Sequence, residues 1–452
     1  MRILSMAGCV IVMGIGCADP QGDTARKSDL PIGDHPKSPA KKTDGNANDK
    51  HPITPQFAND DGYALPRERF EAGWIRLFDG RTLFGWTANS DANWRVKDGV
   101  LVADAGKAGL LVTNVPFADY ELRCEYRLEK GGNSGLFLRT VFQPTNPAVD
   151  CYELNICDTH KTHPTGSLVA RKVAGVKVVK EGEWLTYVVT VQGKRISVQL
   201  DGKQVLDYTD DEKTARRIGF IGLQFREGRI EFRNVLLKPL GTKAIFNGKN
   251  LSSWNIVAGK HPGNVNVNVA DGTIHIKGGS SLESQSEWGD FLLQAGVRTN
   301  AKDVNSGIFF RTMKTVPKQS PNGYELQICN RFAGGDRTKP NDYGSGFGTG
   351  AIFRRQKARR VIPDDNEWCT LTLVAYGNRF ASWVNGYQVA DFRDERPPDQ
   401  NPRKGTRLKS GRFNLQGHDP TTDVSFRNLR VGTLPEAADA NSDKKKKGAA
   451  KR

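Results

Sequence analysis

The feature that most constrains this chain of 452 residues is that it repeats itself at long range. The run 133–140 returns as 305–312, and the run 152–157 returns as 324–329, each 172 residues later. A period of that length far exceeds the roughly 20 to 50 residues of a solenoid or propeller unit. Each copy is long enough to bury a core of its own, so the sequence predicts a tandem duplication of one domain.

Later motifs return at wider spacings, which locates two insertions in the second copy. Thr165 and Thr349 are 184 residues apart, and Phe232 and Phe426 are 194 residues apart. The extra residues fall in a Gly-rich stretch and in an Arg- and Pro-rich stretch, 333–348 and 393–412. Binding varies most in surface loops on a rigid scaffold. We therefore expect the second copy to be remodelled around a ligand or a partner.

The N-terminal segment predicts where the protein works. Arg2 precedes an apolar stretch, 3–16, that is too short to span a bilayer permanently and is typical of a signal peptide. The run ending at Cys17 resembles a bacterial lipobox, so we expect residues 1–17 to be a lipoprotein signal peptide with Cys17 as the lipidated residue. An ordinary signal peptide with a chance Cys is the alternative. The lipoprotein interpretation predicts an exported protein of the bacterial cell envelope, periplasmic or on the outer surface, held to the membrane through a lipid anchor.

Composition and charge limit the classes of partner that the protein is expected to bind. Residues 18–70 are predicted to be a disordered linker and 435–452 a basic disordered tail, because both are poor in apolar residues. The formal net charge is +16, from 66 Lys and Arg against 50 Asp and Glu. A basic surface could attract anionic glycans. The sequence offers no recognition helix, zinc-ligand spacing or RNA-binding strand motif, so nucleic acid is not an expected partner.

Hydrophobic alternation indicates the fold class. Leu122, Cys124 and Tyr126 alternate with charged residues at period 2, and Asp-Gly and Asn-Gly pairs punctuate such runs. No window offers a long amphipathic helix. About 170 residues of short strands per copy predict an all-β protein of two antiparallel sandwiches or jelly rolls. The two domains are expected at 71–241 and 242–434.

The ordered set of motifs resembles a known family. Asn133-Ser134-Gly135, Tyr152-Glu153-Leu154-Asn155, Gly222-Leu223-Gln224 and Phe232-Arg233-Asn234 occur in the order typical of the DUF1080 family, also called the 3-keto-disaccharide hydrolase domain. The resemblance covers residues 74–240 and 243–434. It implies a concanavalin A-like jelly roll whose concave sheet holds a glycan, and it implies hydrolysis or elimination at sugars already oxidised at C3.

The chemistry of such a substrate determines which groups an active site must provide. A ketone at C3 acidifies the hydrogen on C2, so a base can remove it, the C1 substituent can leave, and water can add to the double bond. The site needs a base, a group that stabilises the enolate oxygen and an acid for the leaving group. A divalent metal could supply the second role, although no ligand spacing in the sequence demands a cofactor.

The alternation of side chains along the expected strands indicates which residues are candidates for the site. If Tyr152 and Leu154 face the core, Glu153 and Asn155 share the opposite face, and Phe309 and Arg311 are likewise expected to share one strand face. The catalytic candidates are Glu325, His418, Arg311 and Glu153. The candidate substrate-binding residues are Gln327, Gln416, Tyr324, Phe309, Arg139, Asn155, Tyr152 and Gln224. The alternative is a structural Glu–Arg pair inside the sandwich. The Asn-Ser-Gly motifs are expected to be turns.

The two copies differ at one candidate catalytic position, that of His418. The family's Leu-Gln-x-His pattern survives at Leu415–His418, whereas Arg226 occupies the corresponding place in the first copy. The second copy is therefore predicted to be the better catalyst, and the first could be limited to binding. Two function classes remain open: a carbohydrate-active hydrolase or lyase, and a non-catalytic glycan-binding lipoprotein, since a sandwich fold alone does not choose between them.

Overall fold

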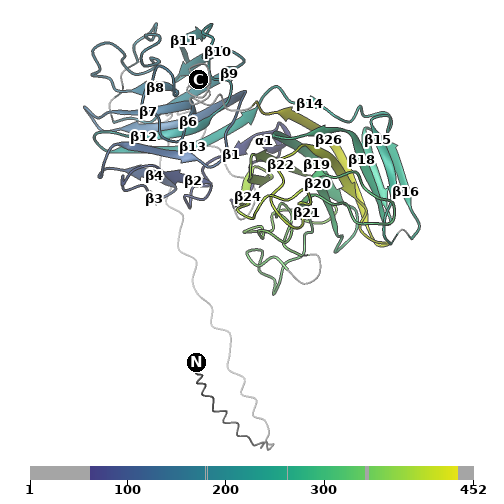
Figure 1. Cartoon of the computed structure of the whole chain (residues 1–452). Helices are drawn as coiled ribbons and strands as arrows, with labels where there is room; N and C mark the ends of the chain where they lie inside the picture. The colour runs from purple at the N-terminus through teal and green to yellow at the C-terminus, as the bar shows by residue number, and fades with distance from the viewer. Residues whose placement is uncertain (1–61, 179, 181, 262, 342–345, 436–452) are drawn as a thin grey trace, which may run out of the picture. The chain divides into compact units, whose positions relative to one another are not determined.

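The computed structural model describes residues 62–178, 180, 182–261, 263–341 and 346–435. The expected signal peptide, Cys17, most of the expected linker and nearly all of the expected tail lie outside these residues. In the described part, α1 (Arg67–Glu71) is a single short helix and the regular structure is otherwise β (Figure 1). Within those same ranges no helix has the length and apolar character to cross a membrane. The predicted all-β class is confirmed.

The first sandwich is built from strands β1 to β13. Its large sheet has the order β11-β10-β9-β6-β13-β4-β3, with β1 paired to β13, and its small sheet has the order β2-β5-β12-β7-β8. The large-sheet strands are β1 (Ile75–Arg76), β3 (Arg95–Lys97), β4 (Val100–Ala103), β6 (Tyr120–Leu128), β9 (Leu185–Gln192), β10 (Arg195–Leu200), β11 (Lys203–Thr209) and β13 (Ile230–Pro239). The small-sheet strands are β2 (Trp86–Ala88), β5 (Gly109–Thr113), β7 (Ser134–Thr140), β8 (Tyr152–Ile156) and β12 (Phe220–Phe225).

The second sandwich repeats this plan with strands β14 to β26. Its large sheet has the order β16-β17-β26-β19-β22-β23-β24, with β14 on β26, and its small sheet has the order β15-β18-β25-β20-β21. The large-sheet strands are β14 (Lys243–Ala244), β16 (Asn266–Ala270), β17 (Thr273–Lys277), β19 (Phe291–Thr299), β22 (Cys369–Tyr376), β23 (Arg379–Val384), β24 (Tyr387–Arg393) and β26 (Asp423–Thr433). The small-sheet strands are β15 (Trp254–Ala258), β18 (Ser280–Trp288), β20 (Ser306–Thr312), β21 (Tyr324–Ile328) and β25 (Gly411–Gln416).

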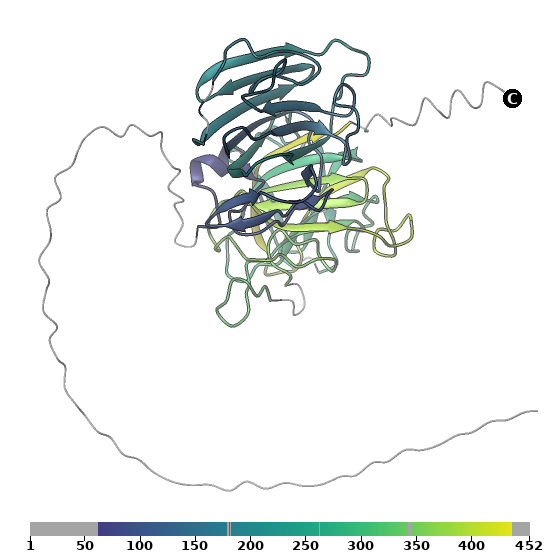
Figure 2. The same ribbon diagram turned by 90° about the vertical axis from the view of Figure 1, so that its left-hand side faces the viewer.

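Each core lies between a large and a small sheet (Figure 2). The alternation of the strands sends every second side chain into the core. In the first sandwich Leu136 and Leu154 of the small sheet belong to one buried cluster with Tyr126 and Tyr187 of the large sheet. The two tyrosine rings stack with centroids 5.0 Å apart. Burial of each leucine contributes roughly 1.5 to 3 kcal/mol relative to an exposed side chain. The outer faces of the sheets, which point away from the cores, are available for binding or catalysis.

Strand β1 of the first sandwich and the residues that follow it also contact the second sandwich. The main-chain N–H of Arg76 donates to Gly386 O at 2.8 Å, and Trp383 Nε1 donates to Arg76 O at 3.0 Å. Arg359 forms an ion pair with Asp79 at 2.8 Å. Trp383 also belongs to the buried cluster of the first sandwich. The domain limits 71–241 and 242–434 stay a prediction. Strand β1 and the residues that follow it connect the two cores.

Candidate functional site

The outer face of the second sandwich's small sheet is polar. On β21 Leu326 points into the core, so Glu325 and Gln327 point outward, as the alternation predicts. The strand register places further side chains on the same face, because directly opposed residues in an antiparallel sheet point the same way. We call these residues the polar face: Glu283, Phe309, Glu325, Gln327, Asn414 and Gln416. All six are less than 10% exposed, so loops cover the sheet here.

Glu325 is the most perturbed carboxyl group of the polar face. It is 8% exposed, and its side chain accepts no hydrogen bond from any residue that the structure describes. A Cβ on Gly307 would lie 2.5 Å from Glu325 Oε1, so the carboxyl lies directly over that glycine. Burial raises the pKa of Glu325 to about 8, against the opposing charges of Arg403 and Arg354. A carboxyl group of this kind is ionised in part at neutral pH and is suited to accept a proton.

The second carboxylate of the polar face is different in character. Glu283 accepts hydrogen bonds from Arg412 Nη1 and from the main-chain N–H of Thr315, both at 2.7 Å. These bonds fix Glu283 as a buried ion pair. Of the two carboxyl groups on this face, Glu325 is therefore the one available for proton transfer.

Two amide oxygens on the polar face are unsatisfied. Gln416 Oε1 and Asn414 Oδ1 are buried and accept no hydrogen bond within the part of the chain that the structure describes. Leaving a buried acceptor unpaired costs roughly 1 to 3 kcal/mol, so native structures seldom keep one without a reason. Asn414 Nδ2 is held by Thr315 Oγ1 at 3.2 Å, which fixes the direction of the free oxygen. Hydroxyl groups of a bound sugar would satisfy such acceptors.

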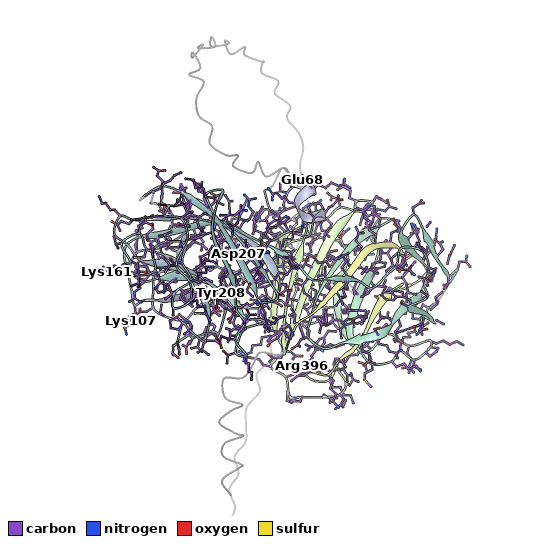
Figure 3. All side chains as sticks on the ribbon, turned by 90° about the horizontal axis from the view of Figure 1, so that it is seen from above. Glu68, Lys107, Lys161, Asp207, Tyr208 and Arg396 are labelled. Atoms are coloured by element: carbon purple, nitrogen blue, oxygen red, sulfur yellow. The ribbon has the colours of Figure 1, made fainter. Side chains whose placement is uncertain are left out.

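The Arg- and Pro-rich insertion of the second copy supplies charge near Glu325. Arg396, labelled in Figure 3, pairs with Asp394 at 2.7 Å and donates to Pro402 O and Gly405 O, so this stretch is folded back on itself. Arg403 Nη2 donates to Pro321 O at 2.6 Å, which ties the insertion to the loop before β21. This anchoring brings the Arg403 charge within electrostatic reach of Glu325.

Arg311 and Arg139 do not lie on the outer faces, and the expectation that Arg311 shares a face with Phe309 is wrong. Arg311 has φ +48°, which breaks the alternation of β20 and turns its side chain into the protein. It donates to three main-chain oxygens and to Asp290 Oδ1 at 2.7 Å. Arg139 repeats the arrangement, with φ +46° and a 2.8 Å bond to Asp119. Both are structural, and the alternative of a structural Glu325–Arg311 pair is also wrong.

The two candidate tyrosines face the cores rather than a ligand. Tyr324 donates to Asp394 Oδ2 at 2.7 Å and Tyr152 donates to Asp210 Oδ2 at 2.6 Å, with each ring in its core cluster. The alternation that places Glu325 outward necessarily turns Tyr324 inward. The prediction that Tyr324 and Tyr152 bind substrate is therefore wrong.

The first sandwich presents a different outer face. Gln224 Nε2 donates to Glu153 Oε1 at 3.4 Å, so Glu153 has the partner that Glu325 lacks, although burial still raises its pKa. Asn155 Nδ2 donates to His163 O at 2.5 Å and is occupied by its own loop. The rest of the face is apolar. Leu110, Val112 and Phe220 stand where Ser281, Glu283 and Arg412 stand in the second sandwich.

His418 lies on the loop that follows β25. Its side chain is 43% exposed, and Nδ1 is 2.7 Å from Asp419 Oδ2. Its main-chain N–H donates to Thr422 Oγ1 at 3.0 Å, which holds the loop at the edge of the polar face. No described hydrogen bond or ion pair joins His418 to Glu325. Its role as an acid stays a prediction.

Glu283 and Asn414 were missed in the sequence, as were the two arginines near Glu325, Arg403 and Arg354. Glu283 and Asn414 alternate with core leucines on β18 and β25, so period 2 alone could have found them. The Asn-Ser-Gly motif is not a turn, because Ser306 begins β20 and donates to Gln416 O at 2.6 Å while Gly307 makes room for Glu325.

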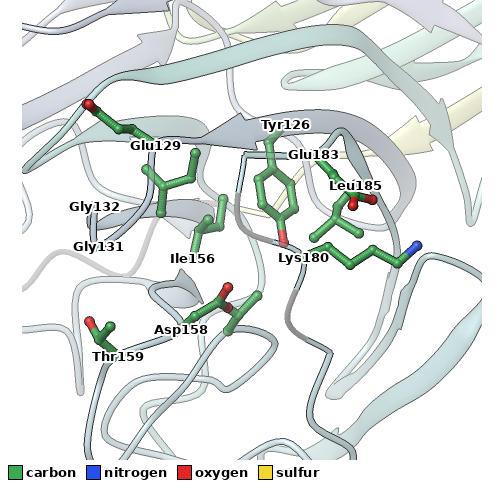
Figure 4. Close-up of a pocket in the computed structure, with 12 residues that line it drawn as sticks. Tyr126, Glu129, Gly131, Gly132, Ile156, Asp158, Thr159, Lys180, Glu183 and Leu185 are labelled. Atoms are coloured by element: carbon green, nitrogen blue, oxygen red, sulfur yellow. The ribbon is translucent and has the colours of Figure 1, made fainter.

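A small enclosed cavity in the first sandwich is not a sugar site. It measures about 20 Å³ and is lined by Tyr126, Ile156 and Asp158 among others (Figure 4). That volume holds about one water molecule. In the described ranges no group of three or more His, Cys, Asp and Glu side chains is arranged to bind a metal ion.

The chain is similar to one curated enzyme in sequence and to several solved structures. A 3-keto-disaccharide hydrolase from Bacteroides thetaiotaomicron is 34% identical over 77 residues, which cover 14% of this chain and 27% of that enzyme, so the match spans about a quarter of the relative. A Parabacteroides distasonis protein provisionally assigned as a glycosyl hydrolase shares 21% identity over 39% of this chain and 99% of its own, with a TM-score of 0.35. A carbohydrate-binding module from Bacillus subtilis shares 17% identity over 34% of this chain and 95% of its own, with a TM-score of 0.27.

One family model covers most of the chain. The model described as the 3-keto-alpha-glucoside-1,2-lyase-like domain matches residues 73–238 and again residues 241–432. The two matches coincide with the two sandwiches. The chain therefore belongs to the family of 3-keto-alpha-glucoside-1,2-lyase-like domains and carries two copies of that domain.

Proposed function

We propose that the second sandwich is the active site of a carbohydrate-active lyase or hydrolase that acts on 3-keto-glycosides, with Glu325 as the base. The observation that carries this proposal is a buried carboxyl group with no hydrogen-bond partner among the described residues and a pKa of about 8. Strongly perturbed acids on a covered polar face are typical of functional sites. The family membership and the Bacteroides relative support a sugar as substrate.

The chemistry follows from the residues around Glu325. Its carboxylate takes the proton from C2, and the electron pair of that C–H bond becomes the C1–C2 double bond as the C1–O bond breaks. Negative charge develops on the C3 ketone oxygen during this step, and the nearby positive charges of Arg403 and Arg354 favour it. In this proposal His418 protonates the leaving oxygen, and addition of water across the double bond completes hydrolysis.

The polar acceptors give the substrate its orientation. Gln416 Oε1 and Asn414 Oδ1 accept hydrogen bonds from sugar hydroxyls, and the ring of Phe309 lies between them and Glu325 in the strand order. Binding satisfies buried acceptors that are otherwise unpaired, so it is favoured by more than an exposed hydrogen bond would give.

The test is turnover of a 3-keto-glucoside by the purified protein. Glu325→Gln keeps the shape of the side chain and removes its basicity, so turnover is expected to fall by roughly 10² to 10⁴. The matched change Glu153→Gln should leave most of the turnover, because Glu153 is already engaged by Gln224. Full turnover by Glu325→Gln would eliminate Glu325 as the base. Repeating the assay with a chelator tests the contribution of a divalent metal.

The first sandwich favours a second function. Its outer face is half apolar and Glu153 is hydrogen-bonded, so we propose that this copy binds a glycan without catalysis. Binding of a non-keto oligosaccharide that survives Glu325→Gln and is lost in Glu153→Ala would support this role. Loss of that binding in the Glu325 variant instead would contradict it.

We further propose that the protein is exported and held in the cell envelope by lipid on Cys17. The run before Cys17 is the only support for this proposal. Cys17→Ser should leave export intact and release the protein from the membrane fraction. A variant that stays with the membrane would show that another feature holds it there.

A further inference from the structure

The first sandwich holds a carboxylate of its own on the outer face of its large sheet. Glu125 on β6 lies directly opposite Arg233 on β13. Its carboxylate accepts a 2.7 Å hydrogen bond from Arg233 Nε and a 2.8 Å hydrogen bond from Asn234 Nδ2. Asn234 is in the left-handed region, with φ +51°, and this conformation aims its amide at Glu125. The Phe-Arg-Asn motif thus forms a carboxylate-binding fork.

The second sandwich keeps the fork and lacks the carboxylate. Arg427 and Asn428 on β26 repeat Arg233 and Asn234, and Asn428 has nearly the same φ, +52°. The residue opposite Arg427 on β19 is Gly296, which has no side chain to fill the place of Glu125. No described residue accepts a hydrogen bond from Arg427 Nε or from Asn428 Nδ2. Arg427 Nε and Asn428 Nδ2 are therefore positioned to bind a carboxylate, and no described residue supplies a carboxylate to them.

An open pocket lies beside Gly296. Its volume is about 320 Å³, and Gly296, Arg427 and Asn428 line it together with Lys238, Trp368 and Arg430. Arg427 lies over the Trp368 ring at 4.1 Å, as Arg233 lies over Trp184 at 4.0 Å, so the arginine stacks on the equivalent tryptophan in both copies. The volume is at the lower end of the range of small-molecule sites.

The charge of the pocket favours an anion. Lys238, Arg427 and Arg430 are basic, and Glu71 on α1 is the acidic residue of the lining. Figure 1 shows α1 beside β22 of this sheet. Glu71 Oε1 is 3.3 Å from Arg427 Nη2, but this pair is about one third exposed, and Glu71 also binds Arg67 at 3.0 Å. Exposed pairs of this kind contribute little, and Nε, the atom that holds the carboxylate in the first sandwich, stays available.

We propose that this pocket binds the carboxylate of a small sugar acid, a hexuronic acid by class. The carboxylate takes the place of the Glu125 carboxylate, between Arg427 Nε and Asn428 Nδ2, and the sugar ring fills the remaining volume beside Trp368. Charge-assisted pairs of this geometry are among the stronger hydrogen bonds in proteins. The site lies on the large sheet, whereas Glu325 lies on the small sheet, so it does not depend on the proposed catalytic role.

Calorimetric titration with glucuronate, and with glucose as the uncharged control, tests the proposal. Glucuronate should bind at least about tenfold more tightly than glucose. Gly296→Glu places a carboxylate in the fork as in the first sandwich and should weaken glucuronate binding by about tenfold or more. Gly296 is not in the left-handed region, and the new Cβ would lie 2.9 Å from Arg427 Cγ and 3.3 Å from Arg427 O, so the Arg427 side chain must shift to admit it.

Two further variants keep the test decisive. Asn428→Ala removes one donor from an exposed position and should weaken binding even if Gly296→Glu folds poorly. Arg233→Met, in the first sandwich, should lower stability and leave glucuronate binding unchanged. Equal binding of glucose and glucuronate, or unchanged binding in folded Gly296→Glu and Asn428→Ala proteins, would overturn the proposal.

Discussion

Replacing Glu325 by Gln should change how the stability of the protein depends on pH. The ordinary pKa of a glutamate is 4.5, and burial raises that of Glu325 to about 8. A group that holds its proton more tightly when folded stabilises the fold below the unfolded pKa and loses that contribution as pH rises through the folded pKa. The wild-type protein should therefore lose stability between about pH 4.5 and pH 8. At about 1.36 kcal/mol for each pH unit, the loss reaches about 5 kcal/mol.

The glutamine variant has no such loss, because its amide is neutral throughout. Below pH 4.5 the wild-type carboxyl is protonated, and the variant should be the less stable protein by the cost of burying its amide hydrogens, about 1 to 3 kcal/mol. Near pH 9 the variant should be more stable by up to about 5 kcal/mol, reduced by the cost of burying the amide hydrogens, about 1 to 3 kcal/mol. Urea unfolding of both proteins at closely spaced pH values from 4 to 9 measures the difference directly.

The control is Glu153→Gln, which changes the equivalent residue of the first sandwich. Glu153 is more exposed and accepts a hydrogen bond from Gln224, so its effect on the pH dependence should be smaller. A wild-type minus Glu325→Gln difference that stays constant from pH 4 to pH 9 would refute the reasoning. It would mean that the carboxyl is solvated or paired in the folded protein.

Three more predictions follow from the same geometry. Because Glu325 must be ionised to act as a base, kcat/KM should rise about tenfold per pH unit below pH 8 and level off above it, and a plateau that already begins near pH 5 would contradict this. Gly307→Ala should destabilise by about 1 to 3 kcal/mol and lower turnover, since the new Cβ meets the Glu325 carboxyl, whereas Gly135→Ala, with contacts of 3.2 Å and beyond, should do so less; unfolding and turnover assays measure both. Arg311→Met and Arg139→Met should each cost about 3 to 5 kcal/mol in urea unfolding by stranding Asp290 or Asp119, and an unchanged midpoint would show these networks to be dispensable.

Much of the fold could be predicted because period 2 is a local signal. The alternation on β21 correctly placed Glu325 and Gln327 on one face, and the duplication allowed each expectation to be checked against a second copy. The prediction failed at Arg311 because a left-handed residue interrupts the alternation, and nothing in the letters Phe-Phe-Arg-Thr marks that turn of the chain. The same alternation predicts that Tyr324 points inward, which conflicts with the prediction that it contacts a ligand.

The electrostatic part of the site could not be predicted from the sequence. The raised pKa of Glu325 comes from loops closing over the polar face, and the partners of Glu283 come from β25 and from the loop after β20. Such contacts join residues far apart in the chain, and a strand pattern carries no information on them. The empty fork at Arg427 is likewise visible only when the register pairs it with Gly296.

The hydrogen bonds that join the main chain of Arg76 to Gly386 O and to the Trp383 indole bear on how this duplication can evolve. A duplicated gene usually remains free to lose one copy, since the survivor folds as its ancestor did. Here deletion of the first copy would remove the buried cluster that covers Trp383 and would expose this large apolar side chain. Loss of the first copy would therefore also disturb the second, so the two copies are expected to be retained together.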